Sequence, residues 1–175
     1  MFEERHHQAL HALRRRLFGY AFALSRDSTD AEDLYQDAIV RAMCARSVPQ
    51  DSVAFRVWMF RLIRNLWIDR LRRESRLGAL MDPATEAEAQ PAPGGEDSLL
   101  DVLLVRQAFH RLSKNHRDVL ALVDVVGFSY DETAQLLALP RGTVMSRISR
   151  ARSALAAQLQ AGPAVPFPRR TERRR

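Results

Sequence analysis

The sequence predicts an all-α protein in which two small helical domains are joined by a flexible acidic linker. Three observations predict this fold class. Apolar side chains recur at helical spacing in both halves of the chain, and residues 129–155 have the pattern of two short helices joined by a tight turn, a helix-turn-helix. Between the halves, residues 78–97 are rich in Pro, Gly and Ala and carry carboxylates but no basic group. The expected domains are therefore residues 1–77 and 98–160, followed by a disordered basic tail over 161–175.

The composition indicates a soluble protein with an anionic partner. The chain has 175 residues, 46% of them hydrophobic, and a formal net charge of +6, which favours nucleic acid as the partner. All of the 27 basic residues except Lys114 are arginines, which can form forked contacts with phosphate or guanine. No segment approaches the roughly 18 apolar residues of a membrane span and no signal peptide opens the chain, so we expect a cytoplasmic protein without membrane insertion.

Neither the cysteine nor the histidines predict a metal site or another cofactor. The single cysteine, Cys44, excludes a disulfide framework and a cysteine-built zinc site, and its apolar helical context predicts a buried, inert thiol. His7 and His11 have the i, i+4 spacing of two metal ligands, and His6 lies beside them. Because no acidic or cysteine partner stands at a fitting spacing, we expect surface histidines and no metal.

The first domain begins with two expected helices. Apolar residues at helical spacing predict a first helix of about 20 residues that ends near Ser25. The second is expected over Asp30–Ala45, with caps offered by residues 28–30. Its inner edge carries Leu34 and Ala38, and its outer face is acidic. The outer residues are Glu32, Asp33, Gln36 and Asp37. An acidic face is not a DNA surface, so it is either solvated or the docking site of a basic protein partner.

A third helix is expected from Ala54, after a loop over Arg46–Ser52 that contains Pro49. One side of this helix is apolar, and its aromatic residues Phe55 and Trp58 are more typical of a core than of base stacking. The other side is covered by arginines: Arg56, Arg61, Arg64, Arg70, Arg72, Arg73 and Arg76. So dense a row of arginines favours phosphate contact over simple solvation.

The second domain is expected to hold about four helices. Ser98 is expected to cap the first, the second begins near Asn115, and Gly127 ends it. Ser129 and Glu132 then have the spacing of a capping box, and Pro140 suits the start of the last helix.

The helix-turn-helix itself has two apolar sides. They are formed by Ala134, Leu137 and Ala138 in its first helix and by Val144, Ile148, Ala151 and Leu155 in its second. The remaining Arg, Ser and Thr face of the second helix suits a DNA major groove, and a solvated amphipathic hairpin is the alternative.

Three motifs in this order resemble the extracytoplasmic-function sigma factors of the sigma-70 family. Residues Asp30–Ala42 resemble the helix that docks on the β′ clamp of RNA polymerase. Residues Ala54–Arg73 resemble the helix that engages the −10 promoter element, and Phe128–Arg152 resemble the helix-turn-helix that reads the −35 element. The resemblance implies core RNA polymerase (its β′ and β subunits) and promoter DNA as partners. It also implies control by an anti-sigma factor and a monomer when free.

The resemblance also implies site residues. The polymerase-binding positions are Asp33, Leu34, Gln36, Asp37 and Ile39. The −10 positions are Val48, Pro49, Arg61, Arg64, Asn65, Arg72 and Arg73, with Asn65 near the pocket for a flipped base. The −35 positions are Arg141, Thr143, Met145, Ser146, Arg147, Ser149 and Arg150, with Arg147 more suited to phosphate. The chain departs from the family at Val48-Pro49, where an aromatic residue is common, and at Met145 and Ser149, so the promoter sequence does not carry over.

Two other classes of protein fit the sequence less well. A stand-alone helix-turn-helix regulator accounts for residues 129–155 but leaves the acidic patch and the arginine-rich helix without a role, and it is usually a dimer. An enzyme is not expected, because the chain has no nucleophile elbow, phosphate-binding loop or cluster of metal ligands.

Overall fold

The computed structural model describes residues 2–78 and 104–161, and all regular elements in these two ranges are helices. The all-α class is therefore confirmed. The predicted linker over 78–97, the cap at Ser98 and nearly all of the predicted tail lie outside the described residues, except that Gly78 is the last residue of a helix. No helix in the described parts of the chain is long and apolar enough to span a membrane.

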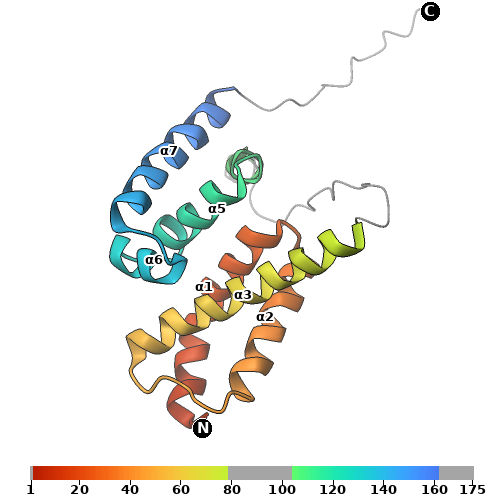
Figure 1. Ribbon diagram of the computed structural model, residues 1–175, viewed down its shortest axis with the longest axis vertical. Helices are drawn as coiled ribbons and strands as arrows, with labels where there is room; N and C mark the ends of the chain where they lie inside the picture. The colour runs from red at the N-terminus through yellow and green to blue at the C-terminus, as the bar shows by residue number, and fades with distance from the viewer. Residues whose placement is uncertain (1, 79–103, 162–175) are drawn as a thin grey trace, which may run out of the picture.

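Three helices make up the first half of the chain (Figure 1): α1 (Glu4–Ser25), α2 (Ser28–Met43) and α3 (Ser52–Gly78). The first ends as predicted, where Arg26 adopts a left-handed conformation with φ 69°. The second starts earlier than predicted because Asp27 is the cap. Its carboxylate accepts from the backbone N–H groups of Thr29 and Asp30 at 2.8 and 2.9 Å, so the predicted caps at 28–30 are wrong.

The second half contains helical residues 104–110, then α5 (Lys114–Leu120), η1 (Ala121–Val125), α6 (Tyr130–Leu137) and α7 (Arg141–Gln160). The η1 segment is a π-helical continuation of α5. Ser113 caps α5, and Gly127, with φ 81°, turns the chain away from η1 in a conformation that glycine adopts without strain.

The helix-turn-helix has the predicted capping box. Ser129 and Glu132 exchange backbone-to-side-chain hydrogen bonds at 2.9 and 3.2 Å. One predicted apolar position is wrong: Ala138 is exposed, because it ends α6 in a left-handed conformation with φ 55°. Leu136 is buried in its place. In α7 the predicted stripe is buried at Val144, Ile148 and Ala151 and half-buried at Leu155.

The two halves share one hydrophobic core. Figure 1 shows α3 running beneath the second half, with α6 above the N-terminal part of α3 and α7 extending away from it. Phe60 of α3 is fully buried between two aromatic rings, with centroid distances of 5.5 Å to Tyr20 of α1 and 5.0 Å to Phe128. Phe60 is buried because α3 packs against the second half as well as against α1 and α2.

Two predictions about single residues are wrong. Cys44 is exposed, because α2 ends at Met43 and the thiol lies at the helix cap rather than inside the helix. His6 is 2% exposed, because the start of α1 packs against the start of α3. His7 and His11 are exposed, as predicted.

Candidate functional site

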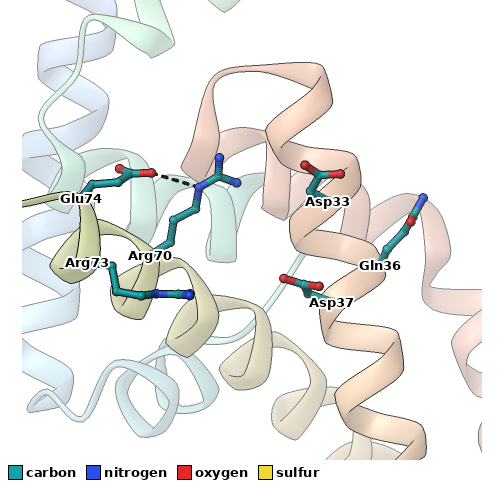
Figure 2. Close-up of a pocket in the computed structure, with 6 residues that line it drawn as sticks. All are labelled: Asp33, Gln36, Asp37, Arg70, Arg73 and Glu74. Carbon is teal, nitrogen blue, oxygen red and sulfur yellow. Dashed lines mark hydrogen bonds and ion pairs between the residues drawn. The ribbon is translucent and has the colours of Figure 1, made fainter. Parts of the chain in front are cut away.

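The acidic face of α2 lines an open cavity of about 490 Å³ opposite α3. Figure 2 shows Asp33 and Asp37 on the α2 side and the guanidinium groups of Arg70 and Arg73 on the α3 side. Arg70 already forms ion pairs with Asp30 at 2.5 Å and with Glu74 at 3.1 Å. Among the described residues no cation pairs with Asp33 or Asp37. The two exposed carboxylates can therefore accept contacts from a basic partner.

The other expected polymerase-binding residues differ in exposure. Gln36 is exposed and donates to Glu32 at 3.1 Å, and Ile39 is half-buried. Leu34 is only 3% exposed, because it shares the inner side of α2 with Ala31 and Ala38. Its side chain belongs to the core in this structure and does not reach a partner on the acidic face.

The loop between α2 and α3 is held at three points. Val48 is 5% exposed, the carbonyl of Pro49 lies 3.2 Å from Nε2 of His6, and the Asp51 carboxylate accepts from the backbone N–H of Ala54 at 2.7 Å. Arg46, Ser47 and Gln50 are among the loop side chains that face solvent. Val48 therefore anchors the loop in this structure, and its neighbours offer the polar groups; its assignment to DNA contact stays a prediction.

Three arginines predicted to contact DNA are bonded to the second half of the chain. Arg56 pairs with Glu132, Arg61 donates to the carbonyl of Gln135 at 3.1 Å, and Arg64 donates to Asp118 at 2.9 Å. All three partners lie on α5 or α6. In this arrangement Arg56 and Arg64 are half-buried against the second half, whereas Arg61 is bonded to it but stays exposed.

The remaining −10 positions are exposed. Asn65, Arg72 and Arg73 face solvent. Arg72 lies 3.7 Å from the Asp69 carboxylate, and Arg73 donates to the Asp69 carbonyl at 3.3 Å. Such exposed contacts are weak and exchange readily with phosphate.

Asp118 is the polar centre of the contact between the halves. The residue is 7% exposed. Its carboxylate accepts hydrogen bonds from the Tyr20 hydroxyl at 2.6 Å and from the Arg64 guanidinium. Burial, and then the nearby Asp118 charge, raise the pKa of Tyr20 well above its usual value, so the hydroxyl remains a donor. Sequence reasoning missed Asp118. The only signal was a carboxylate directly before the apolar run Val119–Leu122.

A second set of contacts joins α1 to residues 104–110. Arg106 lies over the Phe22 ring at 4.4 Å, and Arg26 donates to the His110 carbonyl at 3.3 Å. Burial and three nearby arginines lower the pKa of His110 to about 4, so its ring is neutral at pH 7. An apolar cleft of about 570 Å³ opens at this junction, between Phe18 and Phe22 on one side and Phe109 on the other.

The outer face of α7 is open to solvent. Met145, Ser146, Ser149 and Arg150 are exposed and Thr143 and Arg147 are half-buried, all away from the buried stripe. Arg150 donates to the Ser146 carbonyl at 3.2 Å, and the exposed Arg141 lies 3.4 Å from Asp131. Arg152 is held by Asp124 at 2.6 Å, which is a surface ion pair. The Arg, Ser and Thr face of α7 is therefore exposed, whereas the start of α3 contacts α5 and α6.

Both halves match known families. Residues 9–77 match Sigma-70 region 2, and residues 103–155 match Sigma-70, region 4. The chain is 34% identical over 153 residues to the ECF RNA polymerase sigma factor SigM of Mycobacterium tuberculosis, with 87% of this chain and 72% of SigM covered. It is 31% identical over 151 residues to the ECF RNA polymerase sigma factor EcfG of Rhodopseudomonas palustris, covering 86% of this chain and 83% of EcfG.

The fold is similar to two solved sigma-factor structures. The first is the sigma factor RpoE in complex with the anti-sigma factor NepR from Bartonella quintana, with a TM-score of 0.75, 27% identity and coverage of 92% of this chain and 100% of RpoE. The second is CnrH in complex with the cytosolic domain of CnrY, with a TM-score of 0.65, 29% identity and 92% of each chain covered. The chain is not a stand-alone helix-turn-helix regulator: it belongs to the extracytoplasmic-function (ECF) family of RNA polymerase sigma factors.

Proposed function

We propose that this sigma factor binds core RNA polymerase through the acidic face of α2 and directs initiation at promoters that it reads with both halves. The observation that carries the proposal is the separation of charge on the molecule. A basic chain presents Asp33 and Asp37 on α2, whereas α7 presents Arg150 among hydroxyl side chains. The first surface suits a basic protein and the second a DNA major groove.

The energy of promoter opening supports dependence on polymerase. Opening roughly ten base pairs costs on the order of 14 kcal/mol, at about 1.4 kcal/mol per stacking step. A small basic domain that binds DNA without sequence preference does so at about 10⁻⁴ to 10⁻⁶ M, which is too weak to supply that energy. We therefore place the chain's own contribution in capturing an extruded −10 base, which costs a few kcal/mol.

The promoter distance implies that the two halves separate on the polymerase. The −35 and −10 elements are about 25 base pairs apart, or about 85 Å at 3.4 Å per base pair. Helix α7 starts beside α6, and α6 contacts α3 through the ion pair between Arg56 and Glu132. Helix α7 is about 30 Å long at 1.5 Å per residue. The closed arrangement therefore cannot span both elements. In the proposed cycle it is the form that precedes DNA binding, and residues 1–77 and 98–160 act as separate domains once apart.

An anti-sigma factor is proposed as a second partner, acting on this chain in the cytoplasm. The proposal rests on the two similar structures, in which a sigma factor is bound by an anti-sigma protein. The apolar cleft beside Phe22 and Phe109 offers a surface of the chemistry that an amphipathic partner helix needs.

Replacing Asp37 by arginine tests the polymerase surface. We expect Asp37→Arg to abolish transcription and to lower affinity for core polymerase by at least about 100-fold, because it puts a cation where a basic partner must approach. The measurement is binding of labelled core polymerase together with run-off transcription. Glu4→Arg, at an exposed carboxylate on α1, is the matched charge control and should leave binding unchanged. Unchanged binding by Asp37→Arg would remove the docking assignment.

Replacing Arg150 by alanine tests the −35 surface. The loss of one base contact should weaken −35 recognition by about 1–3 kcal/mol. Run-off transcription on templates with an intact or a scrambled −35 element measures this directly. Arg152→Ala, at an arginine held by Asp124, should change both templates equally. If Arg150→Ala also lowers both equally, Arg150 is not a base reader.

A further inference from the structure

His6 is the polar contact between α1 and the loop before α3. Its Nε2 lies 3.2 Å from the carbonyl oxygen of Pro49, 43 residues later in the chain. Its Nδ1 lies 2.9 Å from the backbone nitrogen of Glu3. A carbonyl only accepts and a backbone N–H only donates, so the neutral ring with its proton on Nε2 satisfies both partners.

The ring of His6 is fixed by packing as well as by hydrogen bonds. Its centroid lies 5.2 Å from that of Phe2 and 5.1 Å from that of Phe55, the first fully buried residue of α3. His6 therefore joins the start of α1, the loop and the start of α3. A ring held by two hydrogen bonds and two aromatic neighbours is a rigid support for the loop backbone.

The supported segment carries the loop's solvent-facing side chains. The side chain of Val48 is buried, and its carbonyl accepts a hydrogen bond from the Gln50 side chain at 3.3 Å. The His6 contact at Pro49 therefore lies between the buried Val48 and the exposed Gln50. Ser47 and Gln50, on either side of the Val48-Pro49 pair, are exposed and can form hydrogen bonds with a base. Their position depends on the backbone that His6 holds.

We propose that His6 is a positioning residue for −10 base selection. It acts through the Pro49 carbonyl, setting the place of Ser47 and Gln50 against the captured base without touching DNA itself. This inference rests on the proposed function, in which the chain captures an extruded −10 base, and on the resemblance that places Val48 and Pro49 among the −10 positions. It gives a role to a buried histidine whose neighbours His7 and His11 are ordinary surface residues.

Two substitutions separate the loop contact from the helix start. Asparagine places its amide near the position of Nδ1 and can still accept from Glu3, but it does not reach Pro49. Glutamine places its amide near Nε2 and can donate to the Pro49 carbonyl. His7→Asn is the matched control, because it makes the same change at an exposed position in the same helical turn.

The experiment is transcription with core polymerase and the full chain on templates that have a randomised −10 element and a constant −35 element. The preference for the best −10 base should fall by about fivefold to tenfold in His6→Asn, the effect of one lost hydrogen bond. His6→Gln should recover most of it, and His7→Asn should match the unmodified chain. Discrimination between intact and scrambled −35 elements should not change in any variant.

Each outcome decides between the two proposals. A uniform fall in transcript yield with the same −10 preference would show that His6 only stabilises the fold, and it would overturn the positioning role. An unmodified chain that shows no −10 preference would overturn the proposed function itself. If His6→Asn does not fold, nitrogen NMR of the unmodified chain still tests the geometry: the His6 ring must be protonated on Nε2 and not on Nδ1.

Discussion

Replacing Asp118 by alanine is expected to release the second half of the chain from α3. The carboxylate is the shared acceptor for the Tyr20 hydroxyl and the Arg64 guanidinium, at 2.6 and 2.9 Å. Its removal leaves a buried hydroxyl and a largely covered cation without their partner, which costs about 3 kcal/mol. Because Asp118 lies on α5 and belongs to neither proposed DNA surface, its replacement should weaken the contact between the halves without removing a DNA contact.

Small-angle scattering and DNA binding measure this release. The radius of gyration of the free protein should increase, and affinity for a single-stranded DNA oligonucleotide should rise by at least about tenfold, since Arg56, Arg61 and Arg64 become free to bind phosphate. Asp118→Asn keeps one acceptor and should show a smaller change. Asp124→Ala removes an exposed carboxylate from η1 and should change neither quantity. A compact Asp118→Ala protein with unchanged DNA affinity would contradict the proposed opening.

Replacing Phe60 by alanine is expected to cause the largest loss of stability. Its ring is fully buried between Tyr20 and Phe128, so truncation leaves a cavity where α1, α3 and the second half meet. The free energy of unfolding should fall by about 3–5 kcal/mol, as measured by urea denaturation followed by circular dichroism.

The control for Phe60 is on the same helix. Val53 is 54% exposed near the start of α3, and Val53→Ala should change the free energy of unfolding by less than about 0.5 kcal/mol. If Phe60→Ala costs no more than this control, the two halves do not share a core in solution. The closed arrangement would then not be the resting form of the protein.

The helices could be predicted from sequence because their signals are local. The capping box at Ser129 and Glu132, the turn at Gly127 and the end of α1 near Ser25 depend on a few neighbouring residues and were confirmed. The acidic outer face of α2 was also confirmed, because the period of the helix alone separates Asp33 and Asp37 from the buried Ala38.

Some features could not be predicted because a residue's environment depends on distant parts of the chain. The burial of Leu34 and Val48, which the resemblance places among partner-binding positions, could not be predicted from neighbouring residues. His6 was expected at the surface, since nothing near it in sequence indicates that Phe55 and Pro49 cover it. The predicted cap of α2 failed for a local reason, because Asp27 competes with the hydroxyl residues that follow it.

The all-α class, the helix-turn-helix and the family could be predicted without a structure, because they depend on periodicity, capping and motif order. Only long-range packing could show that α3 contacts both halves and that Arg56, Arg61 and Arg64 bond to residues of α5 and α6. The physical reason is that a periodic pattern shows which side of a helix is apolar, but it does not show which distant carboxylate or aromatic ring will pack against that helix. Asp118 and Phe60, which hold the halves together, have no local signature, since their roles exist only once Tyr20 and Phe128 lie beside them.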